Sequence, residues 1–167
     1  DANVDTLGKM NFATDVAAGA VASGAATAAG SVTGMTISVT STAAGATAKT
    51  INIDEVKYNS GDDALAVNKK IAAAINDKMD QTGVYAKVDA ASGALTFQSV
   101  KGDQFVSGFA AGTATATTGI ATSATGFTAQ TATAVSDSQV TGKLNISSFK
   151  GAQQALEIVD KALTAVN

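Results

Sequence analysis

The sequence predicts an α+β fold: a β-rich domain that contains a strand-strand-helix-strand-strand module and ends in an amphipathic helix. Three observations lead to this prediction. Residues 31–107 hold segments that alternate apolar and polar side chains, as half-buried strands do, around a segment of helical period. The flanking stretches 1–30 and 108–143 are rich in Ala, Gly and Thr. Residues 149–166 repeat apolar side chains at heptad spacing.

The composition narrows the classes of partner. Charged side chains make up 15% of the 167 residues, and the formal net charge is -3. This charged fraction is well below the roughly 25% of an ordinary soluble domain, so Thr, Ser, Asn and Gly must cover much of the surface. The acidic balance and the absence of a basic cluster speak against nucleic-acid binding. No apolar run reaches the roughly 18 residues of a membrane-spanning helix, so we expect neither a nucleic-acid partner nor a membrane.

The sequence lacks two of the residue types that enzymes use most often in catalysis. It contains no His and no Cys, which removes the commonest general base, the commonest metal ligand and any thiolate nucleophile. The adjacent carboxylates Asp62 and Asp63 lie at a predicted helix N-terminus, where they serve the cap and the helix dipole. Residues 76–83 offer oxygen ligands but lack the order and the terminal Glu of a calcium loop. We therefore predict no enzyme activity and no catalytic, cofactor-binding or metal-binding residues.

The first predicted strands follow a stretch of small side chains. Residues 1–30 have no large apolar stripe, so strand, frayed helix and loop stay open there. From Met35 onward, "MTISVT" alternates apolar with hydroxyl side chains, which predicts a half-buried strand. A loop rich in Ala, Gly and Thr follows at 42–48, and "KTINIDEV" resumes the alternation at Ile51 and Ile53. We expect these two strands to pair antiparallel.

The middle of the chain changes to a helical period. Over residues 62–80, apolar side chains recur along one helical face. Asp62 or Ser60 is the expected N-terminal cap, and Gly83 the left-handed stop. Directly afterwards "GVYAKVD" and "ALTFQSV" alternate again and are joined by "AASG", a short hairpin loop. We expect the helix to pack its apolar face on a small sheet built from the module's strands.

Residues 108–143 alternate Thr with Ala and insert a Gly every few positions. Thr favours a pleated, half-buried surface, and Ala or Gly lets another backbone approach closely. We expect short strands here that face the similar stretch 1–30. Disorder is the alternative, because small side chains bury little apolar area to offset the entropy of ordering the chain.

The tail has the pattern of a helix that lies along another helix. Heptad numbering of residues 149–166 gives two core positions: Phe149, Leu156 and Leu163 at the first, and Ala152, Val159 and Val166 at the second. Ser147 or Ser148 is the expected N-cap. No matching heptad partner occurs elsewhere in the 167 residues. We therefore expect this stripe to meet a helix outside this chain. The alternative is that it packs back on the domain's own sheet.

The tail "LNISSFKGAQQALEIVDKALTAVN" resembles the segment in which bacterial flagellins return from their variable outer region to their helical core. The shared pattern is a hydrophobic residue, Asp or Asn, Ile and Ser, then Gly-Ala-Gln, then an apolar helix with Asp-x-Ala-Leu. The matching positions are Leu144, Asn145, Ile146, Ser147, Gly151, Ala152, Gln153, Ile158, Asp160, Ala162, Leu163 and Val166.

A second resemblance lies in the middle module. "INIDEVKYNS" and "AAAINDKMDQTGVYAKVDAASGALTFQSVKGDQF" are similar to the repeat module of flagellin outer domains and of some filament cap and hook-associated proteins. The matching positions are Ile51, Asn52, Ile53, Ala74, Ile75, Asn76, Thr82, Gly83, Val84, Ala86, Leu95 and Ser99.

These resemblances imply a domain organisation and a role. Residues 1–143 would form the flagellin outer domain, with 1–30 and 108–143 as a small-residue, β-rich base and 31–107 as an inserted repeat module. Residues 144–167 would begin the returning core helix. The chain would then be a structural subunit of the extracellular flagellar filament, which is secreted, self-assembles, serves motility and presents an antigenic surface.

The same resemblance implies the partners. Other flagellin subunits would bind mainly through core helices outside these residues, and host antibodies would bind the surface. O-linked sugars on Ser and Thr, most numerous within 113–141, are implied by analogy with other flagellins. Two alternatives stay open: a domain of a filament cap or hook-associated protein, which shares the middle module, and a carbohydrate-binding adhesive module, which suits a surface of Thr, Asn and Gly.

Overall fold

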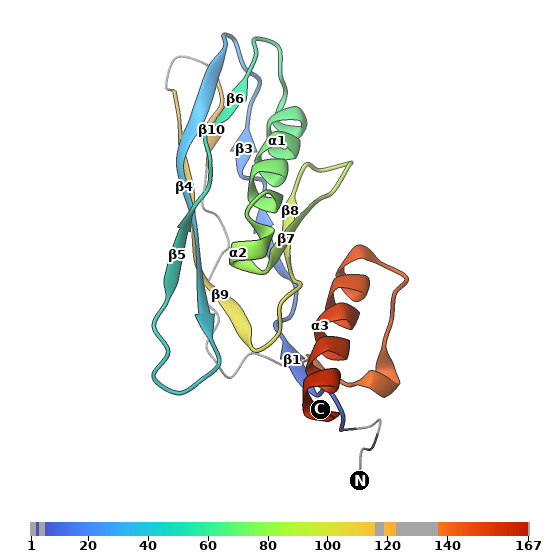
Figure 1. Cartoon of the computed structure of the whole chain (residues 1–167). Helices are drawn as coiled ribbons and strands as arrows, with labels where there is room; N and C mark the ends of the chain where they lie inside the picture. The colour runs from blue at the N-terminus through green and yellow to red at the C-terminus, as the bar shows by residue number, and fades with distance from the viewer. Residues whose placement is uncertain (1–2, 4–5, 116–118, 123–136, 167) are drawn as a thin grey trace.

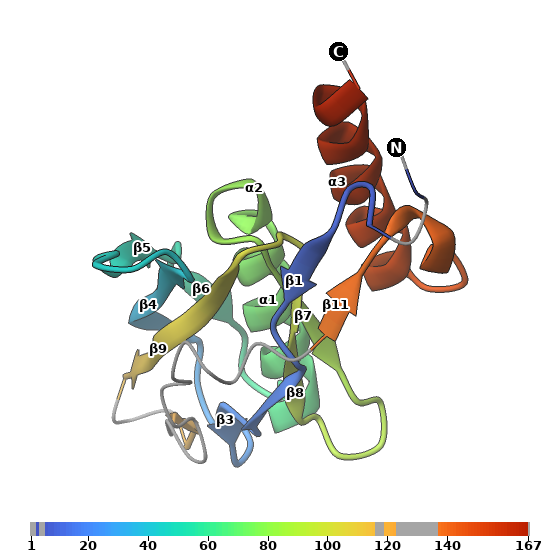
Figure 2. The same cartoon turned by 90° about the horizontal axis from the view of Figure 1, so that it is seen from below.

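The computed structural model describes residues 3, 6–115, 119–122 and 137–166. These residues form an α+β fold with antiparallel sheets. One helix, α1, packs by one face on the body of the molecule. A longer helix, α3, lies at one end, where strands from the two ends of the chain meet (Figure 1, Figure 2).

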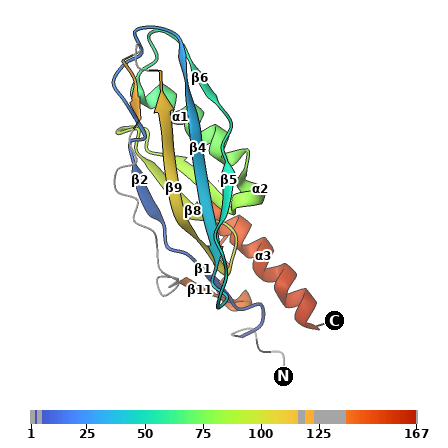
Figure 3. The ribbon, with the colours of Figure 1, turned by 90° about the vertical axis from the view of Figure 1, so that its left-hand side faces the viewer.

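The largest sheet is built around one long strand. Its members, all antiparallel to the first, are β4 (Gly30–Ser41), β5 (Lys49–Asn52), β6 (Val56–Tyr58) and β9 (Gln104–Ala114). The predicted pairing of the first two strands is confirmed, with Ile37 opposite Ile51. The alternation in β4 buries Met35, Ile37 and Val39 and leaves the hydroxyl residues between them half-buried. Figure 3 shows this sheet face on, with α1 behind it.

The second sheet contains the predicted hairpin. Its strands, in spatial order, are β2 (Val16–Gly19), β8 (Leu95–Ser99) and β7 (Val84–Val88). The predicted hairpin is present, and in it Val84 lies opposite Ser99. The expectation of one small sheet under the helix is wrong, because the module's strands divide between two sheets. Strand β9 occupies the free edge of β4, and β2 occupies the outer edge of β8.

The predicted helix is present as two segments, α1 (Ala64–Asn76) and α2 (Met79–Thr82). Gly83 ends the second at a φ of 63°, the left-handed conformation expected of a C-terminal stop. The predicted N-cap is wrong by one residue. Asp63, in an extended backbone conformation, accepts a hydrogen bond from the Ala66 amide at 2.8 Å.

Asp62 and Ser60, the expected caps, have other roles. The Asp62 carboxylate accepts a hydrogen bond from the Asn59 amide at 2.9 Å and pairs with Lys70 at 2.6 Å. The Asn59 bond first, and the Lys70 ammonium second, hold the pKa of Asp62 below its ordinary value. The Ser60 hydroxyl donates to the Thr27 carbonyl. Both side chains therefore stabilise the turn before α1 and do not cap the first amides of the helix.

The small-residue stretches pair with each other, as expected, in two short ladders. These are β1 (Met10–Phe12) with β11 (Asp137–Gln139) and β3 (Ala22–Ser23) with β10 (Ala121–Thr122). The boundary drawn at 107/108 falls inside β9, so base and module share the large sheet. The strands expected within 116–118 and 123–136 lie outside the described residues, as do residues 1–2, 4–5 and 167.

The main core lies between the two sheets and around α1. Residues Val67, Ile71, Ala72 and Ile75 on one face of α1 belong to the same buried cluster as the inward side chains of both sheets. A second, smaller cluster joins Met10, Phe12 and Ile158, and it ties α3 to β1. The molecule therefore has one large core in its body and a small separate core at the end that holds α3.

Asn68 is a polar side chain that is fully buried beside the main core. Asn68 on α1 is 0% exposed, and its amide accepts from the Ala22 N–H at 2.8 Å and donates to the Ala22 carbonyl at 3.1 Å. Asn68 thereby supplies hydrogen-bond partners for the N–H and the carbonyl of Ala22, a buried residue of β3. Asn68 is thus the link that fixes α1 to the small-residue base.

We predict that Asn68→Ala lowers the free energy of unfolding by roughly 2–4 kcal/mol, because it leaves two buried backbone groups without partners. Urea unfolding followed by circular dichroism measures this change. The neighbouring Lys69→Ala is the control, since Lys69 is exposed and should change stability little. Equal, small effects of the two substitutions would contradict the linking role of Asn68.

Candidate functional site

The feature of the chain with the clearest capacity for interaction is α3 (Phe149–Val166). Hydrogen bonds close in sequence fix the start of this helix. Ser148, one of the two predicted N-caps, accepts a hydrogen bond with its hydroxyl oxygen from the Gly151 amide at 3.0 Å. Before it, the Asn145 side-chain oxygen accepts from the Ser147 N–H and hydroxyl, at 2.9 and 2.7 Å, and closes a turn. Together these bonds reverse the chain into the helix. The short helix η2 (Thr141–Lys143) precedes this turn.

One face of α3 docks on the domain. Ala155, Ile158 and Ala162 are buried, and Ile158 forms the small core with two residues of β1. Gly8, just before β1, has a φ of 68°, and a Cβ at this position would lie 2.5 Å from the Ile158 carbonyl oxygen. Position 8 therefore requires glycine for two reasons: its backbone is left-handed, and the segment before β1 approaches the backbone of α3 closely.

Two ion pairs flank this docked face. Lys150 contacts Asp15 at 2.7 Å near the start of α3, and Lys161 contacts Asp103 at 3.0 Å one helical turn from its end. All four side chains are at least one-fifth exposed, and exposed ion pairs add little stability. These ion pairs therefore favour one orientation of α3 but contribute little to the stability of its docking.

The first half of α3 makes two further contacts with the body. Gln154 is 7% exposed and donates its side-chain amide to the Ser99 carbonyl of β8 at 2.9 Å. The Phe149 ring lies 4.6 Å from the ring of Tyr85 on β7, centroid to centroid, within the range of favourable aromatic pairs. The helix is therefore anchored to the second sheet at its N-terminal end and to β1 further along.

The other apolar face of α3 is largely exposed to water, and of its large side chains Phe149 also contacts the body, through Tyr85. Its exposed side chains are Phe149 at 45%, Leu156 at 62%, Val159 at 39%, Leu163 at 57% and Val166 at 65%. With Ala152 they are the predicted heptad positions, and we call these six residues the α3 stripe. The alternative that the stripe packs on the domain's own sheet is wrong for all of it but Phe149, which contacts Tyr85 of β7. The face of Ile158, roughly a third of a turn around the helix, docks instead.

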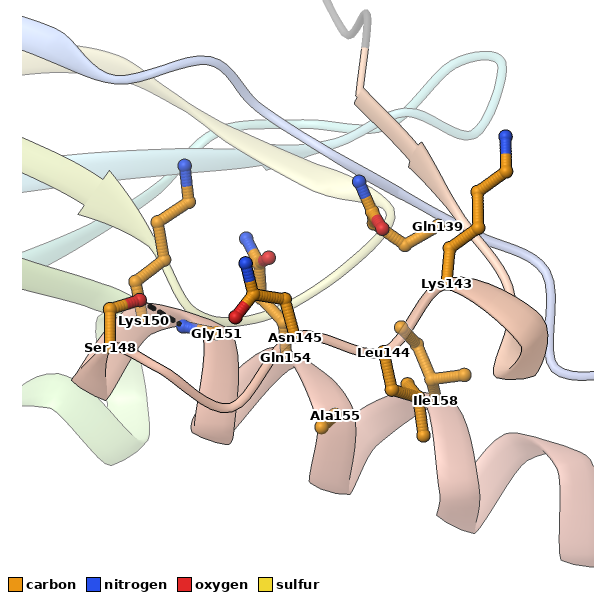
Figure 4. Close-up of a pocket in the computed structure, with 10 residues that line it drawn as sticks. All are labelled: Gln139, Lys143, Leu144, Asn145, Ser148, Lys150, Gly151, Gln154, Ala155 and Ile158. Carbon is orange, nitrogen blue, oxygen red and sulfur yellow. Dashed lines mark hydrogen bonds between the residues drawn. The ribbon is translucent and has the colours of Figure 1, made fainter.

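A hollow of about 220 Å³ opens between the docked side of α3 and the segment before it (Figure 4). Its rim is polar, with Gln139, Lys143, Asn145 and Ser148, while Ala155 and Ile158 line its apolar side. These side chains include no carboxylate and no acid-base pair. The hollow therefore offers hydrogen bonds and two Lys side chains to a ligand.

The described residues contain no group of three or more acidic, His or Cys side chains placed to hold a metal ion. Asp62 and Asp63 lie at the start of α1, where Asp62 pairs with Lys70 and Asp63 caps the helix. Within the described residues, no helix is both long and apolar enough to cross a membrane. The predicted absence of catalytic, cofactor and metal sites stays a prediction.

No protein-family model and no curated protein matches this chain. The flagellin-like pattern of residues 144–166 therefore stays a prediction based on residues. What the structure adds is the geometry of that segment, namely a helix docked by one face with its heptad face uncovered.

The docked face was not predicted, although the sequence held part of its signal. Ala155, Ile158 and Ala162 are apolar positions beside the heptad seam, so the apolar arc of α3 is too wide for a single contact. Gly8 carried no signal, because it is one glycine in a stretch of small residues.

We predict that Gly8→Ala undocks α3, while Gly45→Ala does not. Both glycines have a left-handed φ, of 68° and 75°, but nothing lies within 4 Å of a Cβ at Gly45. Each substitution should therefore cost about 1–2 kcal/mol of backbone strain, and only Gly8→Ala should add the clash with Ile158. Hydrogen exchange read by mass spectrometry should show faster exchange in 149–166 for Gly8→Ala alone. Unchanged exchange would refute the close approach.

Proposed function

We propose that this chain is the surface-exposed outer domain of a bacterial flagellin, a structural subunit of the flagellar filament, and that α3 leads into the filament's helical core. The observation that carries the proposal is the α3 stripe: a heptad face left exposed on a helix whose other face is docked. Full burial of each large stripe residue would contribute roughly 1.5–3 kcal/mol. A core helix packed along the stripe would supply that burial.

The meeting of the chain's two ends supports the same proposal. Strands β1 and β11 pair antiparallel, with Asn11 opposite Ser138, and α3 lies beside them (Figure 2). A domain that stands off a filament must leave and re-enter the core at one place. The β1–β11 ladder and α3 supply such a place at one end of the molecule, and the body extends away from it (Figure 1).

The exposed body would then present the filament's outer surface to the medium and to host antibodies. The large sheet carries hydroxyl side chains that bond to each other across strands, Ser38 to Thr50 at 2.7 Å and Thr40 to Ser107 at 2.8 Å. A surface of short hydroxyl side chains with few charges suits a structural, antigenic role. Sugars linked to Ser or Thr oxygen would modify this surface, and most of the 113–141 segment implied for them lies outside the described residues.

The test is polymerisation of the chain joined at both ends to the terminal core segments of a flagellin. We expect filaments, and we expect Leu156→Gln with Leu163→Gln to reduce their yield at least tenfold, since polar side chains at two stripe positions would oppose helix packing. Electron microscopy and sedimentation of polymer measure the yield.

Glu157→Gln is the matched control, because Glu157 lies on the polar side of the same helix and outside the stripe. It should polymerise like the parent protein. Failure of the parent to polymerise, or full assembly of the double variant, would overturn the proposal. Incorporation only at filament tips would favour a cap protein instead.

A further inference from the structure

We infer that the hollow beside the start of α3 binds one sugar acid, a single ring that carries several hydroxyl groups and one carboxylate. The residues that line the hollow come from β11, η2, the turn after η2 and α3 (Figure 4). They carry this inference, which depends neither on the filament role proposed above nor on the α3 stripe. Three properties of the hollow select the ligand: a buried acceptor, the charge of the rim and the volume.

Gln154 has a buried hydrogen-bond acceptor without a partner among the described residues. It is 7% exposed and lines the hollow. Its side-chain nitrogen donates to the Ser99 carbonyl at 2.9 Å, whereas its side-chain oxygen accepts no hydrogen bond from the described part of the chain. Buried polar groups are hydrogen-bonded in the great majority of cases, and an unpaired one is costly. A hydroxyl group of a ligand in the hollow would donate to this oxygen.

The charge of the rim favours an anionic group. Lys143 and Lys150 line the hollow together with no carboxylate, although the chain as a whole is acidic. Lys150 is paired with Asp15, whereas the exposed Lys143 ammonium makes no ion pair or hydrogen bond within the described residues. Ser148 and the first turn of α3 add a hydroxyl group and the positive end of the helix dipole. A carboxylate beside Lys143 would receive a charge-assisted hydrogen bond.

Lys143 and Gln154 together select a ligand that is negatively charged and also donates hydrogen bonds. Sulfate is charged but has no proton for the Gln154 oxygen, and a neutral sugar has hydroxyl groups but no charge for Lys143. A free amino acid would bring an ammonium group to a lining without a carboxylate to pair with it. A sugar acid meets both requirements, and Ala155 and Ile158 offer an apolar surface to its C–H groups.

The volume of the hollow sets the size of the ligand. About 220 Å³ corresponds to the share of about seven water molecules in the liquid. This space suits one six-membered ring with its substituents, is too small for a disaccharide, and would leave a hydroxy acid of two or three carbons surrounded by water. The Asn145 side-chain nitrogen makes no hydrogen bond within the described residues, since only its oxygen is bound, by Ser147. It is therefore available to a ring hydroxyl group.

Titration of the isotope-labelled chain with glucuronate and with galacturonate, followed by NMR, tests the assignment. For at least one of them we expect saturable shifts of the amides in 143–155, with a dissociation constant on the order of 1 millimolar, as suits so small a ligand. Glucose and sulfate, at matched ionic strength, should each bind at least tenfold more weakly. No shift with either sugar acid up to about 20 millimolar would overturn the inference. Sulfate binding as tight as that of the sugar acid would show a simple anion site and would also overturn it.

Lys143→Gln tests the residue assigned to the carboxylate. It should weaken binding of the sugar acid at least tenfold, to the level of glucose, because the charge-assisted hydrogen bond is lost. Lys69→Gln is the matched control, since it removes the same charge from an exposed residue of α1 outside the hollow. Circular dichroism checks that both variants fold like the parent. Equal weakening by the two substitutions would show a general effect of charge and overturn the assignment. Polymerisation is measured separately, so the filament role can fail while this inference holds.

Discussion

Strand β4 is the constraint on which the rest of the structure depends. It pairs with three other strands, and β9 follows it from Val32 to Ser41. Its inward side chains are buried, so the side of the sheet that receives α1 is fixed by the alternation in β4 itself. Gly112 permits the close approach of β9, because a Cβ there would collide with the Thr33 carbonyl. With β4 and β9 paired, the inward face of the large sheet is the apolar surface on which α1 and the second sheet pack.

The end of the molecule that holds α3 is built differently. It has a small core of its own around Phe12 and Ile158, and it depends on close backbone contact at Gly8 rather than on a large buried area. Helix α3 is apolar over an arc too wide for this core, so one part is buried and the stripe remains exposed. The proposal that a filament core helix packs along the stripe follows from this division of one helix into two apolar faces.

The sequence predicted the elements whose period is unambiguous. The alternation through Met35, Ile37 and Val39, the helix that ends at Gly83 and the cap at Ser148 are all found where expected. These features are local, because each depends on residues within a few positions of each other. The exposed heptad face was also expected, because a 3.5-residue spacing suits a neighbouring helix more than a sheet.

What the sequence did not predict is decided by distant contacts. Strands β1 and β11 are more than a hundred residues apart, and each is only three residues long, too short to give a pattern that identifies its partner. Asp62 and Asp63 are chemically identical, and only the extended backbone at Asp63 directs its carboxylate at the Ala66 amide. The split of the module into two sheets depends on which strand reaches the free edge of β4, and β9 does so from outside the expected hairpin pair.

Hydroxyl-radical footprinting of the monomer is the most direct test of the central claim, that α3 docks by one apolar face and exposes the other. Mass spectrometry of the oxidised chain reports the exposure of individual side chains on the same helix. The structure predicts rapid modification of Leu156 and Leu163, which are 62% and 57% exposed, and slow modification of Ile158, which is 1% exposed. Protection of Leu156 and Leu163 together with rapid modification of Ile158 would show that the stripe is the docked face and would contradict the account.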